Sequence, residues 1–130
     1  MEEGNLNRVK DMWRVYERQG HDAGVDALID VSHDNAEYRF YATGEEVLHG
    51  AEELRAFYRR ERTEGMSVRA AAYDYSDDGD TIYVSGWVRV AREGSGHADA
   101  QVRWIYEFEN GLVKRMIYAP LAAPAPDPVT

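Results

Sequence analysis

The side chains best suited to acid–base chemistry lie in the aromatic stretch from Ala36 to Tyr41 and shortly after it. Glu37 and Arg39 are two positions apart in this stretch, so they share one face if the stretch is extended. A carboxylate beside a guanidinium can work as a general base whose pKa the cation tunes. The alternative interpretation is an exposed ion pair, which would contribute little to stability.

Strand register decides whether that pair reaches a binding site. In one register Glu37, Arg39 and Tyr41 point inward, and the wall that they form is ionisable. A slip of one residue replaces them with Tyr38 and Phe40, and the wall becomes mostly aromatic. The sequence leaves both registers open.

His49 is the third candidate for proton transfer. It comes directly before Gly50, which opens a predicted helix, and an imidazole titrates close to neutral pH. The alternative is a hydrogen-bonded histidine at the surface. Glu37, Arg39 and His49 are therefore the candidate catalytic residues of this sequence.

Other polar clusters favour structural roles. His21-Asp22 and His33-Asp34 are adjacent pairs that we expect in loops or at helix ends, where the aspartates would cap helices. The run from Asp77 to Asp80 lacks the distal glutamate of a calcium loop and is typical of a hairpin turn. The histidine spacing matches no metal site, and no phosphate-binding or dinucleotide motif is present. We therefore expect neither a metal nor a cofactor.

The charge balance excludes several classes of partner. The chain has 130 residues, with 24 acidic and 15 basic side chains and a net charge of -9. Such a surface repels nucleic acid and anionic membranes, so we expect neither as a partner. The first residues lack the pattern of a signal peptide, and cysteine is absent, which excludes disulfides and thiolate chemistry. These features predict a cytoplasmic protein.

Three helices are predicted in the first half of the chain. Apolar residues recur at three- and four-residue steps from Asn5 to Gln19, and Gly20 closes this helix. Similar but shorter patterns predict helices over 23–31 and 51–64. Their short apolar stripes require packing against other elements.

The rest of the chain predicts strands. The stretch from Ala36 to Tyr41 and a short strand ending at His49 form a hairpin around Thr43-Gly44. Four strands then follow in succession, which implies an antiparallel meander. Alternation on the third of them predicts one apolar face toward the helices. The four strands cover 68–76, 81–92, 97–109 and 112–119.

This order of elements resembles the nuclear transport factor 2-like superfamily, and its SnoaL-like branch in particular. The segments that carry the resemblance are RQGHDAGVDALI, HGAEELRAFYRR and IYEFENGLVKRMIYAP. The resemblance implies an α+β fold, a cone-shaped α+β barrel in which three N-terminal helices pack on a curved, mostly antiparallel sheet around a pocket. It also implies a homodimer formed through the outer face of the sheet. The domain would cover 1–119, with a flexible Pro/Ala-rich tail over 120–130.

The resemblance does not extend to the catalytic residues of ketosteroid isomerase. Trp13 falls where that enzyme has its oxyanion tyrosine, and Arg39 or a neighbouring aromatic falls where it has its general-base aspartate. Its second aspartate would align with Trp104 or Arg103. Ketosteroid isomerase activity is therefore rejected as the default.

The aromatic residues on the inward-facing elements of such a cone suit a flat, apolar ligand. The expected ligand-binding residues are Trp13, Tyr16, Tyr58, Trp104, Tyr106 and Tyr118. They predict a cavity protein for a small organic molecule, with cofactor-free isomerase, dehydratase, cyclase or epoxide-opening chemistry if it is an enzyme. The alternative is a non-catalytic dimeric module, in which Tyr83, Ser85, Trp87 and Arg89 share the outer face of one strand.

Overall fold

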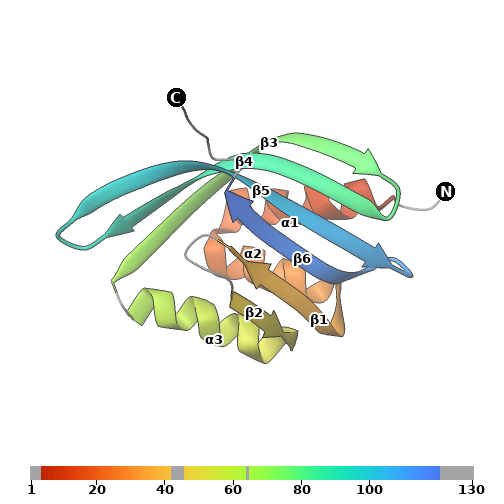
Figure 1. The fold of residues 1–130 in the computed structure, drawn as a ribbon, viewed down its shortest axis with the longest axis horizontal. Coiled ribbons are helices and arrows are strands. Elements are labelled where there is room, and N and C mark those ends of the chain that lie inside the picture. Colours follow the sequence, from red (N-terminus) through yellow and green to blue (C-terminus); the bar gives the residue numbers. More distant parts are fainter. Residues whose placement is uncertain (1–3, 42–45, 64, 121–130) are drawn as a thin grey trace, which may run out of the picture.

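The computed structural model describes residues 4–41, 46–63 and 65–120. Two helices precede the first of six strands, and a third helix lies between the second and third strands (Figure 1). The helices are α1 (Asn5–Gln19), α2 (His21–Asp30) and α3 (Gly50–Thr63). The strands are β1 (Ser32–Phe40), β2 (Glu46–His49), β3 (Met66–Asp78), β4 (Thr81–Arg92), β5 (Gly96–Glu109) and β6 (Leu112–Pro120).

The first helix, α1, has the amphipathic pattern that the sequence predicts. Its apolar stripe buries Val9, Met12 and Trp13 against the sheet, while charged side chains take the other faces. At its end Gly20 adopts a φ of 98°, and its backbone N–H donates to the Tyr16 carbonyl at 2.9 Å. Because that φ favours glycine, the predicted end of the helix is confirmed.

The six strands form one mixed sheet in the order β2-β1-β6-β5-β4-β3. The predicted hairpin and meander are confirmed, because all neighbouring pairs are antiparallel except β1 with β6. That one parallel pair joins the hairpin to the end of the meander. The sheet is not closed by hydrogen bonds, since β2 and β3 are its two edges.

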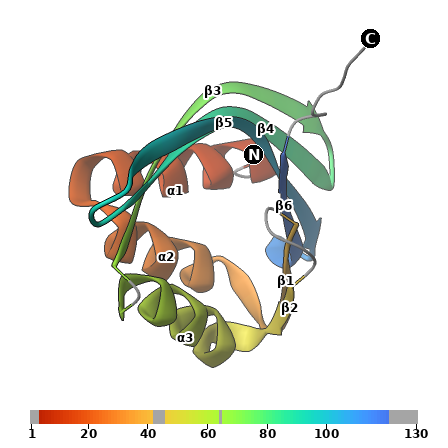
Figure 2. The same ribbon diagram turned by 60° about the vertical axis from the view of Figure 1, so that its left-hand side comes forward.

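The sheet curves, and all three helices lie on its concave side (Figure 2). The predicted alternation on β5 is confirmed: Val102, Trp104, Tyr106 and Phe108 are buried on the concave, inner face. Leu54 of α3 is fully buried in the same core. The helices and the inner face of the sheet therefore share one apolar interior.

A close approach at Gly86 shapes the inner face. The pairing of β3 with β4 shifts between Ala72 and Asp74, which is the signature of a bulge. A Cβ atom on Gly86 would lie 2.1 Å from the Ala71 carbonyl oxygen and 2.8 Å from the Trp104 ring. Only glycine fits this position, and its small size lets the Trp104 ring lie directly over β4.

The structure corrects the expected roles of two His-Asp pairs. His33 and Asp34 were expected in a loop or at a helix end, but they belong to β1, so the prediction that Asp34 caps a helix is wrong. The strand starts early because the Val113 N–H donates to the Val31 carbonyl at 2.8 Å. Asp22 is the second residue of α2, whose N-cap is Gly20 without a side-chain cap.

Two further expectations concern segments outside the described residues. The expected turn at Thr43-Gly44 and the tail after Pro120 lie outside them. Within the described part, no helix is long and apolar enough to cross a membrane.

Candidate functional site

A cavity of about 560 Å³ lies between the helices and the inner face of the sheet. Its volume is in the range of sites that hold small organic molecules. All six residues expected to contact a ligand line it, and three further rings join them. The lining rings are Trp13, Tyr16, His21, Phe40, Phe57, Tyr58, Trp104, Tyr106 and Tyr118.

Rings from three elements form one continuous side of the wall. Trp13 of α1 meets Trp104 of β5 edge to face, with ring centroids 4.6 Å apart. Trp104 lies 5.6 Å from Tyr118 of β6, and Trp13 lies 5.4 Å from Tyr16 one turn along its helix. These contacts hold the rings in place, so the wall is preorganised for a flat apolar molecule.

The register of β1 turns its aromatic residues toward the cavity. Tyr38 pairs with Met116 and Phe40 with Tyr118, both on the inner face of β6. Phe40 then stacks on Phe57 of α3 with ring centroids 4.6 Å apart. Of the two registers that the sequence allowed, the structure has the one with the mostly aromatic wall.

Three tyrosines supply hydroxyl groups to this wall: Tyr106, which is buried, and Tyr58 and Tyr118, which are partly buried. Burial raises the pKa of Tyr118 to about 12, and it also raises the pKa of Tyr58 and of Tyr106. The negative charge of Glu61 acts in the same direction on Tyr58 and Tyr118. Each phenol therefore stays neutral near pH 7 and can donate a hydrogen bond to a ligand oxygen.

Trp13 and Tyr106 bring two polar groups together in the cavity wall. The indole Nε1 of Trp13 is buried and has no hydrogen-bond partner among the described residues. Its N–H points toward the Tyr106 hydroxyl closely enough to lower the pKa of that phenol, against the larger effect of burial. The indole N–H of Trp13 therefore retains the capacity to donate a hydrogen bond to a polar atom.

Charged side chains occupy one part of the cavity wall. Glu46 of β2 and Arg60 of α3 form an ion pair at 3.0 Å, and the Arg60 guanidinium lies 5.4 Å from the centroid of the Phe57 ring. Glu61 and Arg92 also line the cavity. The wall therefore combines aromatic rings with several charged side chains.

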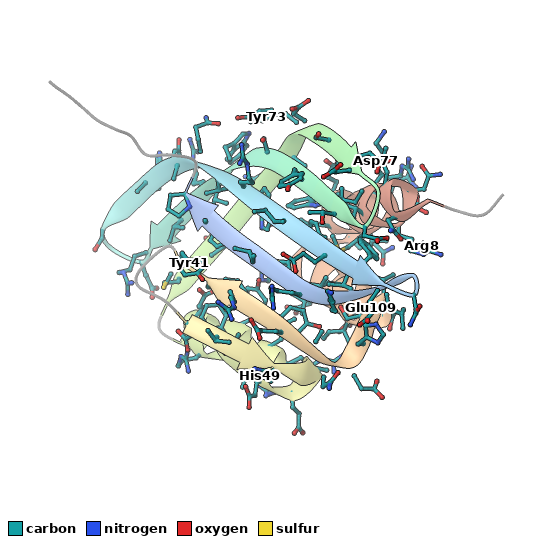
Figure 3. The ribbon with its side chains drawn as sticks, turned by 45° about the vertical axis from the view of Figure 1, so that its right-hand side comes forward. Arg8, Tyr41, His49, Tyr73, Asp77 and Glu109 are labelled. Carbon is teal, nitrogen blue, oxygen red and sulfur yellow. The ribbon has the colours of Figure 1, made fainter. Side chains whose placement is uncertain are left out.

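The candidate catalytic residues Glu37, Arg39 and His49 lie elsewhere. They are on the outer face of the sheet, and none of them lines the cavity. Figure 3 shows Tyr41 and His49 on the side of the sheet that faces the viewer, with helices behind it. The register that points Tyr38 inward necessarily points its neighbours on β1 outward.

These outer residues form a compact charge cluster. Arg39 donates a hydrogen bond to Glu37, whose carboxylate also lies 3.4 Å from Arg115 Nε and 3.8 Å from His49 Nε2. Arg115 reaches the Glu107 carboxylate on the next strand at 3.1 Å. The Arg39 hydrogen bond, more than the nearby charges, lowers the pKa of Glu37 below its ordinary value. Such a carboxylate is a weaker base than an ordinary one.

Sequence reasoning missed five charged or titratable residues that line the cavity: His21, Glu46, Arg60, Glu61 and Arg92. The sequence pattern presents His21 only as half of an adjacent His-Asp pair, although it directly follows the glycine that ends α1. Glu61 lies three residues after Tyr58 and four after Phe57, so helical spacing places it near two lining rings. That spacing was the available signal for Glu61.

Metal ligands are not grouped in the described residues. No cluster of three or more histidine, aspartate or glutamate side chains within 4–41, 46–63 and 65–120 has the arrangement of a metal site. The polar groups of the cavity are instead suited to hydrogen bonding and proton transfer.

Comparison with known proteins agrees with this architecture. A family model described as a SnoaL-like domain matches residues 9–116. No curated protein matches the chain. An NTF2-like protein of unknown function from Burkholderia pseudomallei has a TM-score of 0.77 and 18% identity, with 92% of each chain covered.

Two other solved structures contain small molecules. TerC, co-crystallised with polyporic acid, has a TM-score of 0.73 and 16% identity, with 89% of this chain and 90% of TerC covered. A protein with a ketosteroid isomerase-like fold from Catenulispora acidiphila, in complex with trimethylamine, has a TM-score of 0.70 and 13% identity. That alignment covers 85% of this chain and 82% of the other. At these identities the likeness shows the fold.

Proposed function

The chain belongs to the SnoaL-like domain family, and on this premise we propose that it binds a small, flat, largely apolar organic molecule on the inner face of its sheet. The observation that carries the proposal is the aromatic cavity of about 560 Å³. The co-crystallisation of TerC with polyporic acid supports it, because that protein has a similar fold.

The activity that we propose for this site is proton transfer without a cofactor. Isomerisation, dehydration, cyclisation and epoxide opening are the reactions of this kind. Neutral phenols such as Tyr58 and Tyr118 can stabilise charge on a ligand oxygen, and the same wall carries carboxylates and an imidazole. The charge cluster around Glu37 is not included, because it lies outside the cavity.

The binding proposal is tested by filling the cavity. Ala70 of β3 lines the cavity, whereas its neighbour Ala71 points to the outer face and pairs with Trp87. We expect Ala70→Phe to weaken the binding of 2-naphthol by at least about 100-fold, because the new ring occupies the ligand's space. Isothermal titration calorimetry measures the dissociation constant for the wild type and the variant.

The matched control is Ala71→Phe, which adds the same ring to the same strand on the opposite face. It should bind 2-naphthol as the wild type does. Thermal melts establish that both variants fold. Equal loss of binding in both variants, or no binding of 2-naphthol to the wild type at millimolar concentration, would contradict the proposal.

A second proposal concerns the outer face of the sheet. Tyr83, Ile105 and Ile117 lie directly opposite one another on β4, β5 and β6, where they form an apolar row. Trp87 lies on the same face, and Tyr73 of β3 is 57% exposed. We propose that this face joins two copies of the chain, since apolar and aromatic residues are enriched in the cores of such interfaces.

Light scattering tests the dimer. We expect the wild type to have twice the chain mass of 14.8 kDa and Trp87→Glu to have the monomer mass. The buried charge in the interface would oppose association. A folded Trp87→Glu protein that remains dimeric, or a wild type that is monomeric at high concentration, would overturn this second proposal.

A further inference from the structure

The first part of β5, from Gly96 to Gln101, is paired on one side only. Its pairing with β4 begins at Gly96, but its pairing with β6 begins only at Val102, opposite Pro120. Figure 1 shows this part of β5 extending beyond the end of β6. Among the described residues, no strand covers this open edge, and the six residues along it are exposed. Unpaired backbone groups on such an edge bind a further extended segment readily.

Backbone hydrogen bonds show which residues face the open edge. The Tyr118 carbonyl accepts from the Tyr41 N–H at 2.9 Å, so the backbone groups of Tyr118 face β1. Those of Ala119, the next residue, face Arg103 of β5, which lies opposite it. Because this direction alternates along a strand, every second residue of β5 before Arg103 presents its N–H and C=O to the open edge. These residues are His97, Asp99 and Gln101.

Side-chain contacts hold the open edge in place. Arg89 of β4 donates to both carboxylate oxygens of Asp99, at 2.8 and 3.1 Å. The Tyr73 hydroxyl of β3 donates to the side-chain oxygen of Gln101. These side chains lie on the outer face of the sheet, so they leave the backbone of the edge accessible. The edge is therefore formed before any segment pairs with it.

The prolines that follow β6 have a spacing that suits this edge. All four prolines of the chain are an even number of residues apart, at Pro120, Pro124, Pro126 and Pro128. If the chain continues β6 in the same register, the proline nitrogens face away from β5, and the N–H groups of Leu121, Ala123 and Ala125 face it. An edge strand tolerates proline where the missing N–H would face solvent.

The same prolines favour an extended backbone. A residue that precedes proline is disfavoured in the helical region and adopts β or polyproline II angles. Ala123, Ala125 and Asp127 each precede a proline. Such a segment loses less conformational freedom on pairing as a strand than an unrestricted segment does.

We propose that residues 121–126 continue β6 along the open edge of β5, in the register that places Ala123 opposite Asp99. This register extends the observed pairing of Pro120 with Val102 by one residue at a time. The occupant of the edge is thus the same chain.

In this register the segment also extends the apolar wall of the cavity. Ala122 lies beside Ala100, and Pro124 lies beside Ala98. These two alanines pair with Val88 and Val90 of β4, which both line the cavity. The added strand therefore continues the inner face and shields this end of the cavity from water. This second claim rests on the proposed function, because it concerns a ligand in that cavity.

Amide hydrogen exchange in the full chain tests the pairing. We expect the N–H groups of Asp99 and Gln101 to exchange at least about 100-fold more slowly than those of an unstructured peptide, because the segment covers them. ¹H–¹⁵N NMR in D₂O measures the rates. The N–H groups of Ala98 and Ala100 face β4, so their slow exchange shows in every variant that the sheet is folded.

Two neighbouring proline substitutions separate pairing from composition. Ala123→Pro removes the N–H that faces Asp99 and places a ring against β5, so Asp99 and Gln101 should exchange at least about tenfold faster. Ala122→Pro, the matched control, adds proline where the nitrogen faces away from β5. Its rates should stay within about threefold of the wild type.

Three results would overturn the pairing. One is an unprotected Asp99 N–H in the wild type, and another is equal exchange in the two proline variants. The third is protection of Asp99 that falls as the protein is diluted, which would assign the edge to a second copy of the chain. Protection that is independent of concentration and lost only in Ala123→Pro is the result that the pairing requires.

Isothermal titration calorimetry with 2-naphthol tests the extended wall. Ala123→Pro should weaken binding by about tenfold, and Ala122→Pro should bind within about threefold of the wild type. Equal affinities in the two variants, with exchange rates as expected, would overturn the extended wall and leave the pairing standing. A wild type that does not bind 2-naphthol would overturn the proposed function and the extended wall together, whereas the exchange rates still decide the pairing.

Discussion

On the outer face of the sheet, Glu37 lies among Arg39, Arg115 and His49. On the other side, Tyr118 of β6 and Tyr58 of α3 border a cavity. The outer carboxylate is surrounded by cations, and its pKa is lowered. The inner phenols are surrounded by apolar rings, and their pKa values are raised. The dense charge cluster of the outer face is therefore an ion-pair network, whereas the proposed site is the aromatic cavity of the inner face.

The largest expected difference between the two faces is in stability. Tyr38 is 1% exposed on the inner face of β1, and Arg39 follows it on the outer face. Tyr38→Ala should lower the free energy of unfolding by about 3–5 kcal/mol, because it leaves a hole in the core. Urea denaturation measures this change. Arg39→Ala, the matched outer variant, should shift the midpoint only slightly, and equal losses in the two would contradict the assigned register.

A second pair of neighbours tests the close packing of the inner face. Gly86→Ala should cost about 2–3 kcal/mol, because its Cβ would collide with the Ala71 carbonyl and the Trp104 ring. Ser85→Ala, on the outer face of the same strand, should change the free energy of unfolding by less than about 0.5 kcal/mol. A neutral Gly86→Ala would mean that β3 and β4 are farther apart at the bulge than described.

The smallest expected effect concerns the pH dependence of the outer cluster. The pKa of Glu37 is lower in the folded chain than its ordinary value of 4.5, so its stabilising contribution is fully present above about pH 4.5. That contribution is lost as the pH falls through the folded pKa. Glu37→Gln should lower the thermal midpoint at pH 7 by on the order of 2 °C and should have a smaller effect at about pH 3. A Glu37→Gln variant whose thermal midpoint differs from that of the wild type by the same amount at both pH values would contradict the lowered pKa of Glu37.

Much of the fold could be predicted from the sequence because its patterns were local. The stripe of α1 and the alternation on β5 each gave the correct face, and Gly20 gave the correct helix end. The pairing of β1 with β6 was not predictable in this way, because residues far apart in the chain form it. The early start of β1 at Ser32 follows from that same contact.

The site could be predicted only for its aromatic part. Trp13, Tyr16 and Trp104 lie on elements with clear inner faces, and all three line the cavity. The stretch AEYRFY has large side chains on both faces, so periodicity could not choose between Glu37 and Tyr38. The positions of His21 and Glu61 depend on how α2 and α3 pack together, and residue spacing within each helix gives no information on that packing.

The most direct test of binding on the inner face uses the indole N–H signals of the three tryptophans. Trp13 and Trp104 line the cavity, whereas Trp87 lies on the outer face. Titration with 2-naphthol, followed by ¹H–¹⁵N NMR, should shift the Trp13 and Trp104 signals saturably and leave that of Trp87 in place. A shift confined to Trp87, or no saturable shift at all, would contradict binding on the inner face.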